Sequence, residues 1–104
     1  MSLLKDRIIV ITGAGRGLGR AFAEDCCRQG AEVVIAEKNI EWGQQCELEL
    51  RNAGHTATFF PLDIADPDSV KTLSTDLSKT CKKIDGLVNN AGLATGIGGK
   101  TFEE

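Results

Sequence analysis

The sequence predicts an α/β fold with a parallel sheet and its elements in the order βαβαβαβ, and two observations support this prediction. Short, continuously apolar runs, typical of strands buried on both faces, alternate with longer segments in which apolar residues recur at helical spacing. Strands that alternate with helices in this way form parallel sheets. At 104 residues, the chain is long enough for one such domain and too short for two.

The first predicted strand is RIIVIT, from Arg7 to Thr12, and a helix is expected from about Gly17 to Gln29. Gly30 supplies the helix stop, because glycine readily adopts the left-handed backbone that ends helices. The inner side of this helix is expected to carry the apolar residues at helical spacing, which are Leu18, Ala21, Phe22 and Cys26.

The second predicted strand is EVVIAE, from Glu32 to Glu37. Asn39 is a suitable N-cap for a helix from Ile40 to about Ala53, since its side chain can accept a hydrogen bond from the first turn, and Gly54 ends this helix. The inner stripe, which we interpret as core, is expected to be Trp42, Cys46, Leu50 and Ala53.

The third predicted strand, TATFFPL, covers roughly Thr56 to Leu62, and Asp66 and Pro67 mark the start of the third helix as its N-cap and first helical residue. The fourth strand is IDGLVNN, from Ile84 to Asn90. One face of the third helix is expected to carry Val70, Leu73, Leu77 and Cys81. Three serines on that helix, Ser69, Ser74 and Ser78, are interpreted as surface positions.

Right-handed crossovers predict the strand order 3-2-1-4, which is part of a doubly wound sheet. The first two helices then lie on one face of the sheet and the third helix lies alone on the other. Apolar side chains of IIVIT and EVVIAE are therefore expected to remain uncovered, and the fourth strand is expected to form an open edge. From these features we expect a homo-oligomer and, for an isolated monomer, marginal stability.

Composition excludes several classes of partner. The net charge is −3 and no cluster of Lys and Arg is present, so nucleic acid and anionic membrane surfaces are not expected as partners. The apolar start is interrupted by Lys5, Asp6 and Arg7, which is untypical of a signal peptide or a membrane span, and a cytoplasmic location is expected.

The residues that commonly bind metals are sparse. The four cysteines include no C-x-x-C pair, and His55 is the only histidine. We therefore expect buried or half-buried thiols, and no metal site.

Two glycine-rich stretches could hold a phosphate. The early one, TGAGRGLG from Thr12 to Gly19, lies where a strand ends and a helix begins, so free N–H groups and the positive end of the helix dipole can face an anion. The late one, ATGIGGKT from Ala94 to Thr101, nearly matches a P-loop, but it has alanine in place of the first glycine and does not follow a strand directly. The early stretch is the predicted phosphate site.

Acidic and amide residues follow the other predicted strands. Glu37 ends the second strand, where a carboxylate can accept hydrogen bonds from a ribose; a solvated surface carboxylate is the alternative. Asp63 ends the third strand, and Asn89-Asn90-Ala91-Gly92 ends the fourth. Because the carboxyl ends of parallel strands share one edge, we expect these residues to surround one ligand.

Taken together, TGAGRGLG, Glu37, Asp63 and NNAG resemble the N-terminal half of the short-chain dehydrogenase/reductase family, over about Lys5 to Gly92. The resemblance implies a Rossmann-like fold that binds NAD or NADP, with Asn89 bracing the fourth strand. The cofactor residues it implies are Gly13, Arg16, Gly17, Leu18 and Gly19 near the diphosphate, Glu37 at the adenosine ribose, Asp63 and Ile64 at the adenine, and Asn90, Ala91 and Gly92 beside the ribose and nicotinamide. NAD is expected in preference to NADP, because the Glu37 carboxylate would repel the 2′-phosphate.

The resemblance also implies hydride transfer between nicotinamide and a small-molecule carbonyl or secondary alcohol. The family's catalytic Ser, Tyr and Lys belong to its second half, and this sequence contains no tyrosine. No catalytic residue is therefore assigned, and the 104-residue chain alone is expected to be inactive. Its stop at TFEE favours a truncated oxidoreductase; the alternative is a non-catalytic dinucleotide-binding module that senses the cofactor or pairs with another chain.

Overall fold

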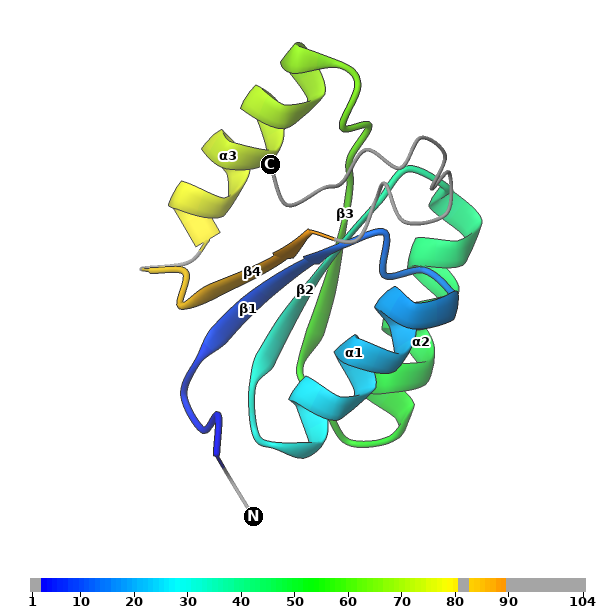
Figure 1. The fold of residues 1–104 in the computed structure, drawn as a ribbon, viewed down its shortest axis with the longest axis vertical. Helices are drawn as coiled ribbons and strands as arrows, with labels where there is room; N and C mark the ends of the chain where they lie inside the picture. Colours follow the sequence, from blue (N-terminus) through cyan, green and yellow to red (C-terminus); the bar gives the residue numbers. More distant parts are fainter. Residues whose placement is uncertain (1–2, 81–82, 90–104) are drawn as a thin grey trace, which may run out of the picture.

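The fold is an open parallel α/β sheet, seen in a computed structural model that describes residues 3–80 and 83–89 (Figure 1). The order βαβαβαβ and the strand order β3-β2-β1-β4 confirm the predicted fold class. Boundaries differ from the prediction by one or two residues. The elements are β1 (Ile8–Thr12), α1 (Gly17–Arg28), β2 (Glu32–Glu37), α2 (Ile40–Asn52), β3 (Ala57–Pro61), α3 (Pro67–Thr80) and β4 (Gly86–Asn89).

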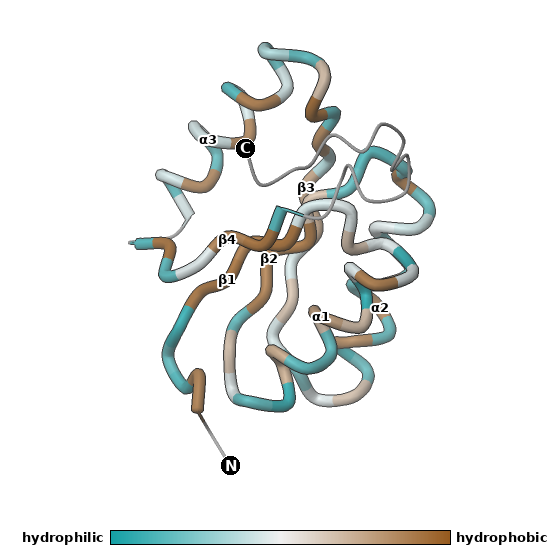
Figure 2. The backbone as a smooth tube through the Cα atoms, viewed as in Figure 1, coloured by the Kyte–Doolittle hydropathy of each residue, from teal (hydrophilic) through white to brown (hydrophobic). Residues whose placement is uncertain are grey.

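Helices cover the two faces of the sheet unequally. Figure 1 shows α1 and α2 on one face and α3 alone on the other, as the right-handed crossovers predict. The larger core cluster lies under α1 and α2, around Ile11, Val33 and Ile35, whereas a smaller one lies under α3 around Val10 and Val34. The apolar strands form the brown centre of Figure 2.

The buried face of α1 differs from the prediction by one position. Gly19, Ala23 and Cys27 are buried, whereas Leu18 and Phe22 are exposed and Cys26 is half-buried. The buried residues are small and recur every four positions, so the helix backbone approaches the sheet closely. The larger apolar residues, which the periodicity placed inside, lie at the rim of that contact.

In α2, Cys46 and Leu50 are buried as predicted, but Ala53 is exposed and the Trp42 side chain is 38% exposed. Gly43 takes the inner position instead. A Cβ at Gly43 would lie 2.1 Å from Cε1 of Phe59, so the aromatic ring of Phe59 packs directly on the helix backbone. The interpretation of Trp42 as a core residue was therefore wrong.

Side chains of α2 cap the outer edge of the sheet. In every second residue of β3 the backbone N–H and C=O groups point away from β2. Among these residues, Phe59 donates its backbone N–H to Glu47 Oε2 at 2.8 Å. Arg51 Nε donates to the Ala57 carbonyl at 2.6 Å, and Pro61 has no N–H. Glu47 and Arg51 also form an ion pair at 3.6 Å. These contacts occupy backbone groups that an added strand would need.

On the face of the sheet that carries α3, the exposed apolar residues are not the ones that the sequence predicted. Val10 of β1 and Val34 of β2 are buried beneath α3. The apolar side chains left exposed include Leu87 of β4, which is 65% exposed, and those of Ile84 and Val70. The expectation for IIVIT and EVVIAE was therefore wrong, because α3 covers the centre of the sheet and leaves the β4 side open.

Asp85 ties the start of β4 to the start of β1. Its Oδ2 accepts the Ile8 N–H at 2.8 Å, and its own N–H donates to the Ile8 carbonyl at 2.8 Å. Lys83 and Arg7 lie 3.3 and 3.5 Å from Oδ1. The bond from Ile8 lowers the pKa of Asp85 below its ordinary 3.8; desolvation opposes this change, and Lys83 and Arg7 add to the lowering.

This lowered pKa predicts an acid-dependent loss of stability at Asp85. A carboxylate with a folded-state pKa below its unfolded value of 3.8 stabilises the fold above that pH, and the contribution is lost as pH falls through the folded pKa. Asp85→Asn should therefore be less stable than the parent at neutral pH, with the difference shrinking below pH 3.8. Urea unfolding across pH measures this. Asp25→Asn, an exposed carboxylate, is the control, and a pH-independent difference at Asp85 would contradict the assignment.

The edge contacts of α2 predict a second effect. Removing both side chains, Glu47→Ala with Arg51→Ala, should lower the free energy of unfolding by about 1–3 kcal/mol, since each hydrogen bond contributes roughly 0.5–1.5 kcal/mol. It should also increase self-association, because the β3 edge can then pair with another strand. Sedimentation and thioflavin binding report the association. Gln44→Ala on the same helix is the matched control, and unchanged association of the double variant would show that the edge needs no cap.

Candidate functional site

The glycine-rich loop joins the carboxyl end of β1 to the amino end of α1. Gly13 and Gly17 both have φ of 65°, a backbone region that favours glycine, and the Gly13 N–H donates to the Ala36 carbonyl at 2.8 Å. Arg16 precedes α1 as an extended N-cap without a side-chain capping bond, and the first turn carries no acidic residue. The positive end of α1, with Leu18 exposed in its first turn and Gly19 buried beneath, can therefore accept an anion.

Glu37, at the end of β2, is buried beside this loop. Its side chain accepts two backbone hydrogen bonds, from Gly15 N–H to Oε1 at 2.9 Å and from Asn39 N–H to Oε2 at 3.0 Å. The residue is only 8% exposed, so the alternative of a solvated surface carboxylate was wrong. The β2 end and the loop are joined at this point, and a ligand at the loop would lie close to an acceptor of hydroxyl hydrogen bonds.

The loop also contacts α2. The Arg16 guanidinium lies over the Trp42 ring, 4.0 Å from its centroid. A Cβ at Gly15 would lie 2.7 Å from Trp42 Cβ and 2.8 Å from Glu37 Oε1, so only glycine fits between them. Neither Gly15 nor Trp42 was identified from the sequence as part of the site. Gly15, in the middle of TGAGRGLG, was the signal in the sequence for a close approach of the backbone.

The loop between β3 and α3 contributes a second carboxylate. Asp63 Oδ1 accepts the Ala65 N–H at 3.0 Å, and Oδ2 lies 4.0 Å from Lys38 Nζ. The Asp63 N–H donates to Ser69 Oγ at 2.9 Å, so the interpretation of Ser69 as a plain surface residue was wrong. Ile64 is exposed beside them and offers an apolar surface.

Thr12 and Asn89 join the ends of β1 and β4. Thr12 Oγ1 donates to Asn89 Oδ1 at 3.0 Å, which confirms that Asn89 braces the fourth strand. Asn90, Ala91 and Gly92, predicted to follow it in the site, lie outside the described residues, as does the late glycine-rich stretch from Ala94 to Thr101.

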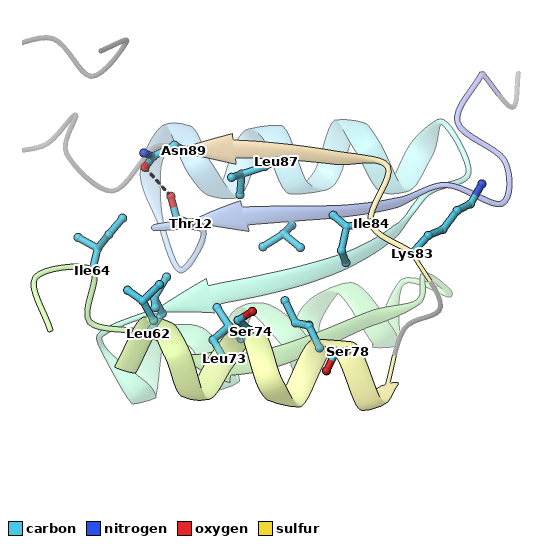
Figure 3. A pocket seen from close by; sticks show the side chains of 13 residues that line it. Thr12, Leu62, Ile64, Leu73, Ser74, Ser78, Lys83, Ile84, Leu87 and Asn89 are labelled. Carbon is cyan, nitrogen blue, oxygen red and sulfur yellow. Dashed lines mark hydrogen bonds between the residues drawn. The ribbon is translucent and has the colours of Figure 1, made fainter. Parts of the chain in front are cut away.

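A cavity of about 520 Å³ opens on the α3 side of the sheet (Figure 3). Its walls are mainly apolar, with Leu73 of α3 opposite Leu87 of β4, and the hydrogen-bonded pair of Thr12 and Asn89 lies at one end. The cavity therefore extends from the ligand edge of the sheet along the face that α3 leaves open. It is separate from the contacts of Glu37 and Trp42 on the other side of β1.

The three cysteines of the described residues, Cys26, Cys27 and Cys46, are free thiols that lie buried or half-buried. Burial raises the pKa of the Cys27 thiol to about 11, and burial also raises the pKa of Cys46. Cys26 is half-buried and also has a raised pKa, mainly through burial. In residues 3–80 and 83–89 no group of His, Cys, Asp and Glu side chains is arranged to hold a metal ion. Within the same part of the chain, no helix has the length and apolarity needed to cross a membrane.

The described residues are thus arranged to suit a ligand that carries both an anionic group and a hydroxyl group. An anion fits the uncapped start of α1, and a hydroxyl-bearing group fits beside the Glu37 carboxylate, next to an apolar surface at Ile64. These features lie at the carboxyl edge of the parallel sheet, where ligands bind in such folds.

Comparison with known proteins places the chain in a family. Residues 7–104 match the short chain dehydrogenase family. The chain is 41% identical over 95 residues to L-rhamnose 1-dehydrogenase (NAD(P)(+)) of Azotobacter vinelandii, covering 88% of this chain and 37% of that protein. It is 39% identical over 88 residues to carbonyl reductase (NADPH) 1 of Mus musculus, covering 84% of this chain and 32% of that protein.

Solved structures agree with the sequence comparison. The crystal structure of a short-chain dehydrogenase/reductase from Burkholderia phymatum in complex with NAD is 30% identical, with a TM-score of 0.77, over 84% of this chain and 31% of that one. The chain spans about a third of the length of the relatives it matches. Since the family match extends over nearly the whole sequence, the chain belongs to the short chain dehydrogenase family.

Proposed function

We propose that the chain is the NAD(P)-binding portion of a short-chain oxidoreductase that interconverts a secondary alcohol and a carbonyl. The observation that carries the proposal is the pairing of the uncapped start of α1 with the buried Glu37 carboxylate, 2.9 Å from the Gly15 N–H. A dinucleotide has both groups that this edge can bind, a diphosphate and a ribose. When bound, the nicotinamide accepts or supplies the hydride.

In this proposal each part of the edge holds one part of the cofactor. The loop and the first turn of α1 bind the diphosphate, Glu37 binds the adenosine ribose, and the exposed Ile64 with Asp63 borders the adenine. The diphosphate residues are Gly13, Arg16, Gly17, Leu18 and Gly19; Asn90, Ala91 and Gly92 are proposed beside the nicotinamide half from the sequence alone. A cytoplasmic location and a homo-oligomeric assembly remain predictions of the sequence.

A second candidate is a non-catalytic dinucleotide-binding module that senses the cofactor or pairs with another chain, which the same loop and Glu37 carboxylate would serve equally well. No described side chain is placed to exchange the proton of an alcohol at neutral pH. Mass spectrometry of the natural product separates the two candidates. A polypeptide near the length of the relatives supports the oxidoreductase, and a natural product of this size supports the module.

The position of Glu37 predicts tighter binding of NAD than of NADP. Two unit charges about 4 Å apart repel by roughly 4 kcal/mol at an effective dielectric of 20, before screening by salt. Glu37→Gln keeps the size of the side chain and an oxygen acceptor for the Gly15 N–H, but removes the charge together with the acceptor of the Asn39 N–H. We expect this variant to raise the ratio of NADP to NAD affinity by about tenfold or more. Titration of both cofactors measures the ratio.

Controls separate this charge effect from a structural one. Glu37→Ser, which also loses the bond to Gly15, should raise the ratio while weakening both cofactors. Glu41→Gln, an exposed carboxylate in the first turn of α2, should leave the ratio unchanged. Equal or tighter binding of NADP by the unaltered chain would overturn the preference, and binding of neither cofactor would overturn the proposed function.

Turnover by the chain alone is expected to be absent. The family resemblance implies a tyrosine as the general acid/base, and these 104 residues contain none. A pure 104-residue preparation should bind cofactor yet show no NAD reduction with a panel of secondary alcohols. Genuine turnover would contradict this expectation and would place a proton-transferring group within the chain.

A further inference from the structure

We propose that Trp42 is a positioning residue for the glycine-rich loop: its side chain holds Gly15 and Arg16 in the conformation that binds the cofactor. The inference rests on the proposed function, because it concerns the same site. Trp42 lies in the first turn of α2, is 38% exposed and is not among the buried residues of that helix.

The first contact is between Trp42 and the loop backbone. Trp42 Cβ would come within 2.7 Å of a Cβ at Gly15, so the tryptophan packs directly on this glycine. Gly15 also donates its N–H to Glu37 at 2.9 Å. The loop backbone is thereby in contact with a side chain of α2 and with the carboxylate that ends β2.

The second contact fixes the residue that begins α1. The Arg16 guanidinium stacks on the Trp42 ring at 4.0 Å, a distance at which the cation is attracted to the aromatic face. Arg16 is the N-cap of α1, and its extended backbone leads the chain into the first turn. Restraint of Arg16 therefore restrains the N–H groups that the proposed function assigns to the diphosphate.

Trp42 is separate from the packing that holds α2 on the sheet. The buried residues of that helix are Gly43, Cys46 and Leu50, and Trp42 belongs to neither core cluster. The backbone N–H of Trp42 donates to Asn39 Oδ1 at 3.0 Å, a capping bond that does not depend on the indole side chain. Replacement of the indole should therefore alter the loop while the helix stays folded.

The test compares Trp42→Leu, which removes the aromatic face, with Trp42→Phe, which keeps it, and with Leu48→Ala, an exposed apolar residue on the same helix. We expect Trp42→Leu to weaken NAD and NADP by the same factor, about two- to fivefold, as expected for an exposed cation–aromatic contact. Trp42→Phe should retain most of the affinity, and Leu48→Ala all of it. Thermal unfolding verifies that each variant is folded.

A double-mutant cycle tests whether Trp42 affects cofactor binding through Arg16. Arg16→Leu alone should weaken binding at least as much as Trp42→Leu, because it also removes a cation from the proposed diphosphate site. Adding Trp42→Leu to Arg16→Leu should then cause no further loss. Additive losses, or full affinity in Trp42→Leu, would overturn the proposal. If Trp42→Leu fails to fold, Trp42→Met, which keeps a larger apolar side chain but no aromatic face, takes its place in the cycle.

A measurement without cofactor separates this inference from the proposed function. Hydrogen exchange at the Gly15 N–H, which is bonded to Glu37, should be faster in Trp42→Leu than in Leu48→Ala or the unaltered chain. Faster exchange in a chain that binds no cofactor would sustain the positioning role and refute the proposed function. Unchanged exchange would refute the positioning role even if NAD binds.

Discussion

The hydrogen bond between the buried Glu37 carboxylate and the Gly15 N–H connects the two parts of the candidate site. A buried carboxylate is costly unless donors surround it, and here two backbone N–H groups, of Gly15 and Asn39, satisfy its oxygens. The bond requires a glycine, because Trp42 and Glu37 leave no room for a Cβ at position 15. The loop that leads into α1 is thus fixed to the end of β2 before any ligand binds.

Parallel strand pairing brings the carboxyl ends of the strands to one edge of the sheet. β1 pairs with β2 on one side and with β4 on the other, so Thr12, Glu37 and Asn89 all lie at the same edge of the sheet. Thr12 bonds to Asn89 across one pair, and Gly13 bonds to Ala36 across the other. The groups at these strand ends therefore hold one another in place through hydrogen bonds.

The two sides of the sheet differ in how completely they are covered. The β3 edge is capped by Glu47 and Arg51, and the face beneath α1 and α2 is closely packed through small helix residues. The face beneath α3 holds a cavity of about 520 Å³ and leaves Leu87 exposed on β4. The relatives are about three times as long as this chain.

The order of apolar runs and helical segments determined the element order, the strand order and the edge at which the site lies, because periodicity and crossover handedness are local properties of the chain. The glycine spacing and Glu37 likewise identified the loop and its acidic neighbour. Only the tertiary structure decided which side of a helix is buried: small residues at Gly19, Ala23 and Gly43 allow close approach to the sheet, which leaves Phe22 and Trp42 at the rim. The stack of Arg16 on Trp42 and the burial of Glu37 depend on the distance between α2 and the loop. That distance is set by packing between segments far apart in sequence, and no local pattern encodes it.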